Sequence, residues 1–207
     1  MVAKWLFRLA RSRMMGKFVG YWFQYGSLLL PVKKVFTSSE VVSFFHPRPS
    51  YPNHLLLVPK RAIRSLNELA QRDHHRFFLA ILAAAREVAS QRGMSDYVLC
   101  SNGGARQEVM QVHFHLFAGN GWANAPQDLG SVLLEDDRVI ACDHPQASWE
   151  THLVIESKQR LWEDVIEALP AVVESRRLLE NGYTVVVPPA GDGALHLIAG
   201  KWRGDSA

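Results

Sequence analysis

Two histidines in a short alternating segment, Gln111–Phe117, are the residues of this chain best suited to chemistry. Polar and apolar side chains alternate there until the apolar pair at its end, and a period of two indicates a half-buried strand. Such a strand would direct Val112, Phe114 and Leu116 into a core, and it would line one wall of a cleft with Gln111, His113 and His115. Because imidazole is the side chain whose charge and nucleophilicity are most easily tuned near neutral pH, the segment predicts chemistry at a phosphate or a metal.

Residue types make the metal the weaker alternative. A His-x-His pair can bind zinc, but a catalytic zinc site uses a third protein ligand, and no Asp, Glu or Cys shares a comparable strand spacing with His113 and His115. Cys100 and Cys142 form no CxxC pair, so neither a thiolate zinc site nor a disulfide framework is expected. We therefore expect no metal, no cofactor and a reducing, cytoplasmic location.

Composition predicts a globular protein with one good core or two small ones. Of the 207 residues, 48% are hydrophobic and 21% are charged, and the formal charge of +3 is too small to indicate nucleic-acid binding. Basic residues concentrate in an N-terminal arm, residues 1–29, which contains no acidic residue. The apolar stretch Met14–Val32 is interrupted by Lys17, Gln24 and three glycines, so no stable membrane insertion is expected. A membrane-surface or targeting role for the arm stays open.

The chain also repeats itself. Seven positions recur at a constant spacing of 98 residues, with one aromatic exchange: His46, Pro47, Ser50, Tyr51, His54, Leu55 and Lys60 return as His144, Pro145, Ser148, Trp149, His152, Leu153 and Lys158. Further along, His115–Gly119 corresponds to His196–Gly200. This second alignment sets Ala194 opposite His113 and Asp192 opposite Gln111. Only the first half can therefore be a histidine site.

Both halves show the same order of expected elements. In the first, Ser65 with Glu68 predicts a capped short helix, and Asp73 predicts the start of a long helix that stops near Gly93. Strands are expected at Leu55–Val58, Tyr97–Cys100 and Val109–Phe117. In the second, a helical stretch 159–179, interrupted at Pro170, precedes strands Tyr183–Val187 and Ala194–Ile198. The fold class is α+β, with an antiparallel sheet and a helix packed across it in each half.

The segment around His113 and His115 resembles the histidine-triad (HIT) superfamily, whose signature is His-φ-His-φ-His-φ-φ with φ apolar. Gln111–Phe117 fits it at six of seven positions. The resemblance extends upstream to the positions Leu30, Pro31, Lys33, Phe36, Phe44, Pro49, Pro52, His54 and Val58–Lys60. Members work as pairs of units, either as homodimers or, as in galactose-1-phosphate uridylyltransferase and the diadenosine polyphosphate phosphorylases, as two halves of one chain. The resemblance therefore implies an intrachain pseudo-dimer: an arm at 1–29, an active HIT-like half at 30–125 and a degenerate half at 126–207, with further oligomerisation left open.

The resemblance also implies a mechanism. His113 would attack the α-phosphorus of a nucleotide to give a covalent nucleotidyl-histidine, with His115 and Gln111 as the other catalytic positions. Substrate-binding residues by the same resemblance are His46, Asn102, Gln107, Glu108, Phe36 and Phe44. His46 stands where the family usually carries a ribose-binding aspartate, and Glu108 stands where a small hydroxyl residue is common. The expected function is a nucleotide hydrolase or nucleotidyltransferase acting on a phosphoanhydride or phosphoramidate.

The sequence leaves two other functional hypotheses open. The substituted site could bind a nucleotide without turning it over, or both halves could form a scaffold for a protein partner. Formation of an acid-labile adduct by the wild type, and its loss in His113→Ala, would distinguish the enzyme from either.

Overall fold

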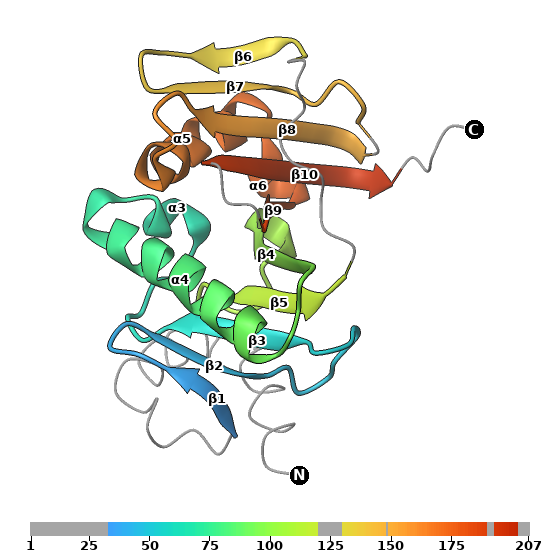
Figure 1. Ribbon diagram of the computed structural model, residues 1–207. Helices are drawn as coiled ribbons and strands as arrows, with labels where there is room; N and C mark the ends of the chain where they lie inside the picture. The colour runs from blue at the N-terminus through green and yellow to red at the C-terminus, as the bar shows by residue number, and fades with distance from the viewer. Residues whose placement is uncertain (1–32, 120–129, 148, 190–192, 203–207) are drawn as a thin grey trace.

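A single antiparallel sheet of ten strands organises the described part of the chain, which comprises residues 33–119, 130–147, 149–189 and 193–202 in this computed structural model. The strand order is β1-β2-β3-β5-β4-β9-β10-β8-β7-β6 (Figure 1). In chain order the strands are β1 Lys34–Thr37, β2 Val41–Phe45, β3 Leu55–Pro59, β4 Tyr97–Gly103, β5 Phe114–Ala118, β6 Val132–Glu135, β7 Val139–Asp143, β8 Trp149–Ser157, β9 Tyr183–Val187 and β10 Ala194–Trp202. The expected α+β class with antiparallel pairing is confirmed, and the sheet runs unbroken from the first half into the second through β4 and β9.

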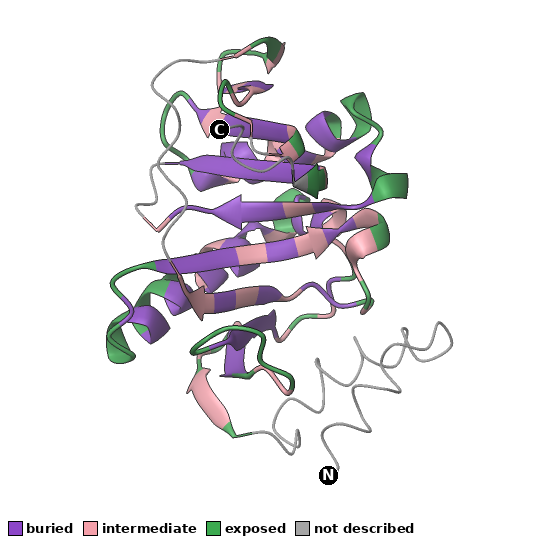
Figure 2. Cartoon of the chain, turned by 90° about the vertical axis from the view of Figure 1, so that its right-hand side faces the viewer, coloured by how far each residue is buried: buried purple, intermediate pink, exposed green. Residues whose placement is uncertain are grey.

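The helices are short except for one in each half. They are α3 Leu66–Leu69, η1 Arg72–His74, α4 His75–Gln91, η2 Gly104–Arg106, α5 Trp162–Ser175 and α6 Leu178–Asn181. Both long helices, α4 and α5, lie on the same face of the sheet (Figure 1) and enclose one core with it. Phe78 of α4 and Trp162 of α5 meet there edge to face, with ring centroids 5.9 Å apart. The strands at the middle of the sheet are buried along most of their length (Figure 2).

Helix boundaries follow local signals only in part. Ser65 caps α3 as expected, because its hydroxyl accepts the Glu68 N–H at 3.1 Å. The prediction that Asp73 starts the long helix is wrong: Asp73 lies inside η1, and α4 begins at His75 without a side-chain cap. The interruption at Pro170 is also wrong, since α5 continues through this residue. A continuous buried stripe on α5 outweighs the hydrogen bond that proline removes, a cost of about 3 kcal/mol.

On the face away from the helices, one row of paired residues crosses all ten strands: Lys34, Phe44, Leu56, His115, Cys100, Val186, His196, Val154, Cys142 and Val132. Both His115 and His196 lie in this row, so we call this side of the sheet the histidine face. The two outermost strands, β1 and β6, each carry a register shift, between Lys34 and Phe36 and between Val132 and Leu134.

Two further expectations concern the chain ends and the membrane. The basic arm at residues 1–29 lies outside the described residues. No helix in the described ranges is long and apolar enough to span a bilayer.

Candidate active site

The alternation in Gln111–Phe117 correctly predicts which side chains are buried, but the strand is shorter than expected. Val112, Phe114 and Leu116 are all buried in the main core. However, β5 begins only at Phe114, so the expected strand Val109–Phe117 is too long at its start. The segment before β5 leaves the sheet, and the backbone N–H of Val112 donates to the carbonyl of Ile63 at 2.7 Å instead.

His113 is held by the backbone around it. Its ring Nδ1 lies 2.8 Å from the carbonyl oxygen of Gln111. A carbonyl oxygen only accepts, so Nδ1 carries the proton and the lone pair of the neutral ring is on Nε2. The Ser101 hydroxyl donates to the carbonyl of His113 at 2.7 Å, which ties this backbone to β4. The tautomer with a basic Nε2 is the one that nucleophilic attack requires.

Opposing influences act on the charge of His113. Burial lowers its pKa most strongly and nearby His46 lowers it further, while the hydrogen bond to Gln111 and the Glu108 carboxylate raise it. The net direction is downward from the usual 6.5. The ring is therefore neutral near pH 7.

A second hydrogen-bond chain sets the tautomer of His115. The Ser50 N–H donates to Nδ1 of His54 at 3.3 Å, so His54 carries its proton on Nε2. That Nε2 lies 2.9 Å from Nδ1 of His115, which must accept. His115 is left with an N–H on Nε2, and its ring lies 5.1 Å from that of His113. Position 115 therefore supplies an N–H donor beside the His113 ring.

Burial keeps both His54 and His115 uncharged. It lowers the pKa of His115 to about 3, with His113, His54 and His46 contributing in the same direction. It lowers the pKa of His54 to about 4, with His46 contributing. Both rings are hydrogen-bonding groups rather than proton carriers near pH 7.

His46 joins these rings. It stacks on His54 with centroids 4.2 Å apart and planes 6° apart, and its centroid lies 5.6 Å from that of His115. The Arg48 N–H donates to Nδ1 of His46 at 3.1 Å, so the proton of the neutral ring is on Nε2. The structure thus gathers His46, His54, His113 and His115, which come from three separate segments of the chain.

Gln111 departs from its expected position on the wall of the site. Its side chain is 1% exposed, and Nε2 donates to the carbonyls of Arg61 at 3.0 Å and Pro59 at 3.3 Å. Among the described residues, its buried Oε1 has no hydrogen-bond partner. Position 111 orients His113 through its backbone carbonyl, so the substitution of histidine by glutamine leaves that contact intact.

The three polar residues expected ahead of the triad segment behave differently from one another. Asn102 lies on β4, two residues beyond Cys100 and thus on the histidine face, and its Oδ1 accepts from the Thr184 hydroxyl at 2.8 Å. Gln107 uses its amide N–H groups on the carbonyls of Arg64 and Val109, which shape the loop. Glu108 is exposed, and its charge is close enough to His113 to raise the pKa of that ring.

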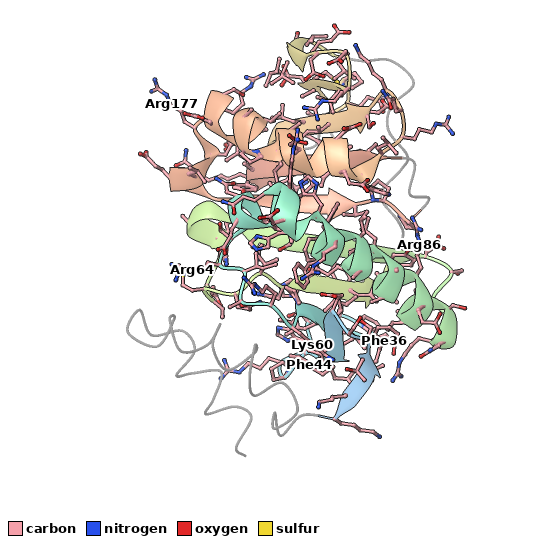
Figure 3. All side chains as sticks on the ribbon, turned by 90° about the vertical axis from the view of Figure 1, so that its left-hand side faces the viewer. Phe36, Phe44, Lys60, Arg64, Arg86 and Arg177 are labelled. Carbon is pink, nitrogen blue, oxygen red and sulfur yellow. The ribbon has the colours of Figure 1, made fainter. Side chains whose placement is uncertain are left out.

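The two expected aromatic residues do not come together. Phe44 lies in the row that contains His115 and is buried in a small cluster with Val42, Leu56 and Val58. Phe36 packs against the main core on the helix side of the sheet. Figure 3 labels both at the β1–β2 edge. Because they lie on opposite faces, they cannot wall one base pocket together.

Two groups of three histidines have the composition of a metal site. The ligand atoms of His46, His54 and His115 lie within 4.8 Å of one another, and so do those of His144, His152 and His196. No acidic residue or cysteine spaced along β5 supplies the third ligand atom; in the first group it comes from His46 and His54, which flank the connection between β2 and β3. An imidazole binds a metal ion in its own ring plane, however, and the first two rings of each group lie in nearly parallel, separate planes, stacked at 6° and 12° with centroids 4.2 and 4.1 Å apart. Neither group converges on one ion without turning a ring.

The second half reproduces the histidine arrangement without a counterpart of His113. His144 stacks on His152 at 4.1 Å, His152 Nε2 lies 3.0 Å from His196 Nδ1, and the Gln146 N–H donates to His144 Nδ1 at 3.1 Å. Each value matches its counterpart in the first half within 0.1 Å. Ala194 occupies the position two residues before His196, where His113 precedes His115.

Sequence reasoning missed three residues at this site: Ser101, Arg106 and Thr184. Arg106 donates to Thr184 Oγ1 at 3.3 Å and to the Gly200 carbonyl at 2.8 Å. Thr184 follows Asn102 by 82 positions, and the two meet only because β4 pairs with β9. No spacing in the sequence predicts that contact.

Known proteins share this site region. The HIT domain model matches residues 29–121. An uncharacterized 13.2 kDa HIT-like protein of Azospirillum brasilense is 33% identical over 94 residues, which are 44% of this chain and 77% of that protein. The purine nucleoside phosphoramidase of Escherichia coli K12 is 26% identical over 94 residues, which are 44% of this chain and 78% of the enzyme.

A solved structure extends the likeness in fold to both halves. The crystal structure of a DUF4931 family protein from Bacillus cereus covers 82% of this chain and 85% of its own, with a TM-score of 0.53 and 10% identity. At that identity only the fold is comparable. The HIT domain match and the 33% identical relative settle the family itself: this chain belongs to the histidine-triad (HIT) family.

Proposed function

We propose that this chain is a nucleotide hydrolase or nucleotidyltransferase that acts at the α-phosphorus of a phosphoanhydride or phosphoramidate through a covalent nucleotidyl-His113. The observation that carries the proposal is the hydrogen bond from His113 Nδ1 to the Gln111 carbonyl, which leaves a basic Nε2 on a neutral ring. The relative named purine nucleoside phosphoramidase supports a phosphorus–nitrogen bond as one target.

In the first step, the Nε2 lone pair of His113 attacks phosphorus, and the bond to the leaving group breaks with its electron pair. The ring becomes a cation because Nδ1 keeps its proton, and the Gln111 carbonyl stabilises that charge. The N–H on His115 Nε2 donates to a phosphoryl oxygen as charge develops there. A water or another acceptor then attacks phosphorus, the phosphorus–nitrogen bond breaks, and neutral His113 is restored.

The leaving group takes its proton from water, and Glu108 is the carboxyl side chain near it. Glu108 lies beside His113 by its effect on that residue's pKa, and it replaces a small hydroxyl residue common in the family. Glu108 is therefore the acidic side chain of this site placed to interact with the leaving group.

We further propose that the chain is an intrachain pair of HIT-like units, with boundaries at 30–125 and 126–207 after the arm at 1–29. The matched histidine stacks and the row that crosses all ten strands support this division. The second unit, which has Ala194 in place of a nucleophile, would complete the sheet and support the first. Two unbridged thiols, Cys100 and Cys142, agree with a reducing cytoplasmic location.

The alternative is a nucleotide-binding HIT module with weakened catalysis. It is favoured by His46, an imidazole where the family usually has a ribose-binding carboxylate, and by the acidic Glu108 beside the nucleophile. Either change weakens productive binding more than it disturbs the orientation of His113.

Incubation with adenosine 5′-phosphoramidate carrying a labelled phosphorus separates these functions. The enzyme predicts an acid-labile, base-stable adduct on the wild type and on the control His74→Ala, whose imidazole lies at the start of α4, and none on His113→Ala. Binding of adenosine 5′-monophosphate without an adduct would leave the binding module. Absence of both adduct and binding would refute both.

A further inference from the structure

The boundary between the two halves passes beside the proposed nucleophile. Strand β4 pairs with β9, and in that register Asn102 faces Thr184. On the other side of β4, Cys100 pairs with His115, so Asn102 and His113 occupy the next matching positions along the two segments. The Ser101 bond to the His113 carbonyl keeps the backbones together there. Asn102 is thus flanked by His113 on one side and by a residue of the second half on the other.

Hydrogen bonds at this boundary have only one allowed direction. A guanidinium only donates, so the Thr184 hydroxyl accepts from Arg106 Nη1 at 3.3 Å. The single hydroxyl proton of Thr184 then goes to Asn102 Oδ1 at 2.8 Å. Because Oδ1 is the accepting end of the amide, the two N–H groups of Asn102 are turned the other way. The Gly200 carbonyl, bonded to Arg106 Nη2 at 2.8 Å, fixes the guanidinium from β10.

We infer that Thr184 is a positioning residue for the His113 site: by holding Asn102 Oδ1, it directs the Asn102 N–H groups toward the phosphoryl group under attack. This inference rests on the proposed function. An amide held in one orientation before the reaction stabilises developing charge better than one that must rotate. The half that lacks a nucleophile would thus act in catalysis through one hydroxyl.

Sheet packing alone does not account for a hydroxyl at this position. Cys100 and Val186 hold corresponding places in the row, each one strand in from His115 or His196. Val98 lies two residues before Cys100, and Thr184 lies two residues before Val186. Val98 is a buried apolar residue, so the corresponding place in the first half needs no polar group. Thr184 differs from it by the hydroxyl that reaches Asn102.

A double-mutant cycle tests the inference with Thr184→Val, Asn102→Ala and their combination. The readout is the single-turnover rate of adduct formation from adenosine 5′-phosphoramidate, with thermal melting of each variant. Loss of one preorganised donor costs on the order of 100-fold, which sets the effect of Asn102→Ala. Thr184→Val should slow the step roughly 10-fold because the donor remains but is no longer oriented. The combination should be no slower than Asn102→Ala alone.

Two controls separate positioning from structure. Thr184→Ser keeps the hydroxyl and should restore most of the rate, and Thr37→Val makes the same chemical change at the exposed end of β1 and should leave it unchanged. A wild-type rate in Thr184→Val, or losses that multiply in the combination, would overturn the inference. Should the wild type form no adduct, the proposed function fails by itself. The affinity for adenosine 5′-monophosphate then decides the inference, and equal affinities in wild type and Thr184→Val, or no binding, would overturn it.

Discussion

The histidine face makes stability depend on pH in a window where carboxylates contribute little. Burial lowers the pKa of His54 and His196 to about 4 and that of His115 and His152 to about 3. In the unfolded chain these residues would titrate near 6.5. Between pH 6.5 and about 4 the unfolded state therefore binds more protons than the folded state, and the free energy of unfolding falls as the pH falls.

The size of the effect follows from the width of that window. Each histidine that stays neutral in the fold costs about 1.4 kcal/mol per pH unit below 6.5, or about 2 kcal/mol at pH 5. Four such residues together cost roughly 8 kcal/mol at pH 5, which is comparable with the 5–15 kcal/mol stability of a typical domain. His113 and His144, whose pKa values are also lowered by burial, act in the same direction. We expect the protein to unfold, or to come close to unfolding, near pH 5.

Urea denaturation at pH 7, 6 and 5 measures this directly. A matched variant, His196→Gln, replaces one imidazole of the second half by an amide that does not titrate. Its loss of stability between pH 6.5 and 5 should be smaller than that of the wild type by about 2 kcal/mol, whatever its stability at pH 7. An unfolding free energy that stays flat from pH 7 to 5, or a variant with the same slope as the wild type, would refute the reasoning.

Three other outcomes follow from the site and core. His46→Asp should tighten adenosine 5′-monophosphate binding about 10-fold by calorimetry, because a carboxylate can accept from two ribose hydroxyls; weaker binding would contradict this. Gln111→Ala should leave the rate of adduct formation within about 3-fold of wild type while costing about 1–3 kcal/mol in urea denaturation, since it strips the carbonyls of Pro59 and Arg61 of their donor. Phe114→Ala, in the core beneath the site, should cost about 3–5 kcal/mol, and a loss below 1 kcal/mol would mean that its cavity collapses.

Sequence patterns predicted features that depend on neighbours along the chain. The alternation at Val112, Phe114 and Leu116 identified core residues because a side chain's face is set by local backbone geometry. Strand β9 was expected at Tyr183–Val187 and has those bounds, since a run of β-branched residues favours a strand wherever it packs.

The features that could not be predicted from the sequence depend on residues far apart along the chain. Gln111 was expected on the wall of the site, but carbonyls of the β3 end, about 50 positions away, hold its amide inside. Pro170 was expected to break a helix, yet burial against the sheet keeps α5 whole. The contact of Asn102 with Thr184 exists only because β4 and β9 pair, and the sequence of neither strand predicts its partner in the other half.

The register shifts in β1 and β6 bear on how this protein behaves at high concentration. A long sheet ends in two edges whose unpaired backbone groups can recruit another chain, and this is a common route to aggregation. Here each edge strand is four residues long and irregular, so neither offers a straight template for a foreign strand. In the part of the chain that the structure describes, both ends of the ten-stranded sheet therefore disfavour edge pairing with another chain.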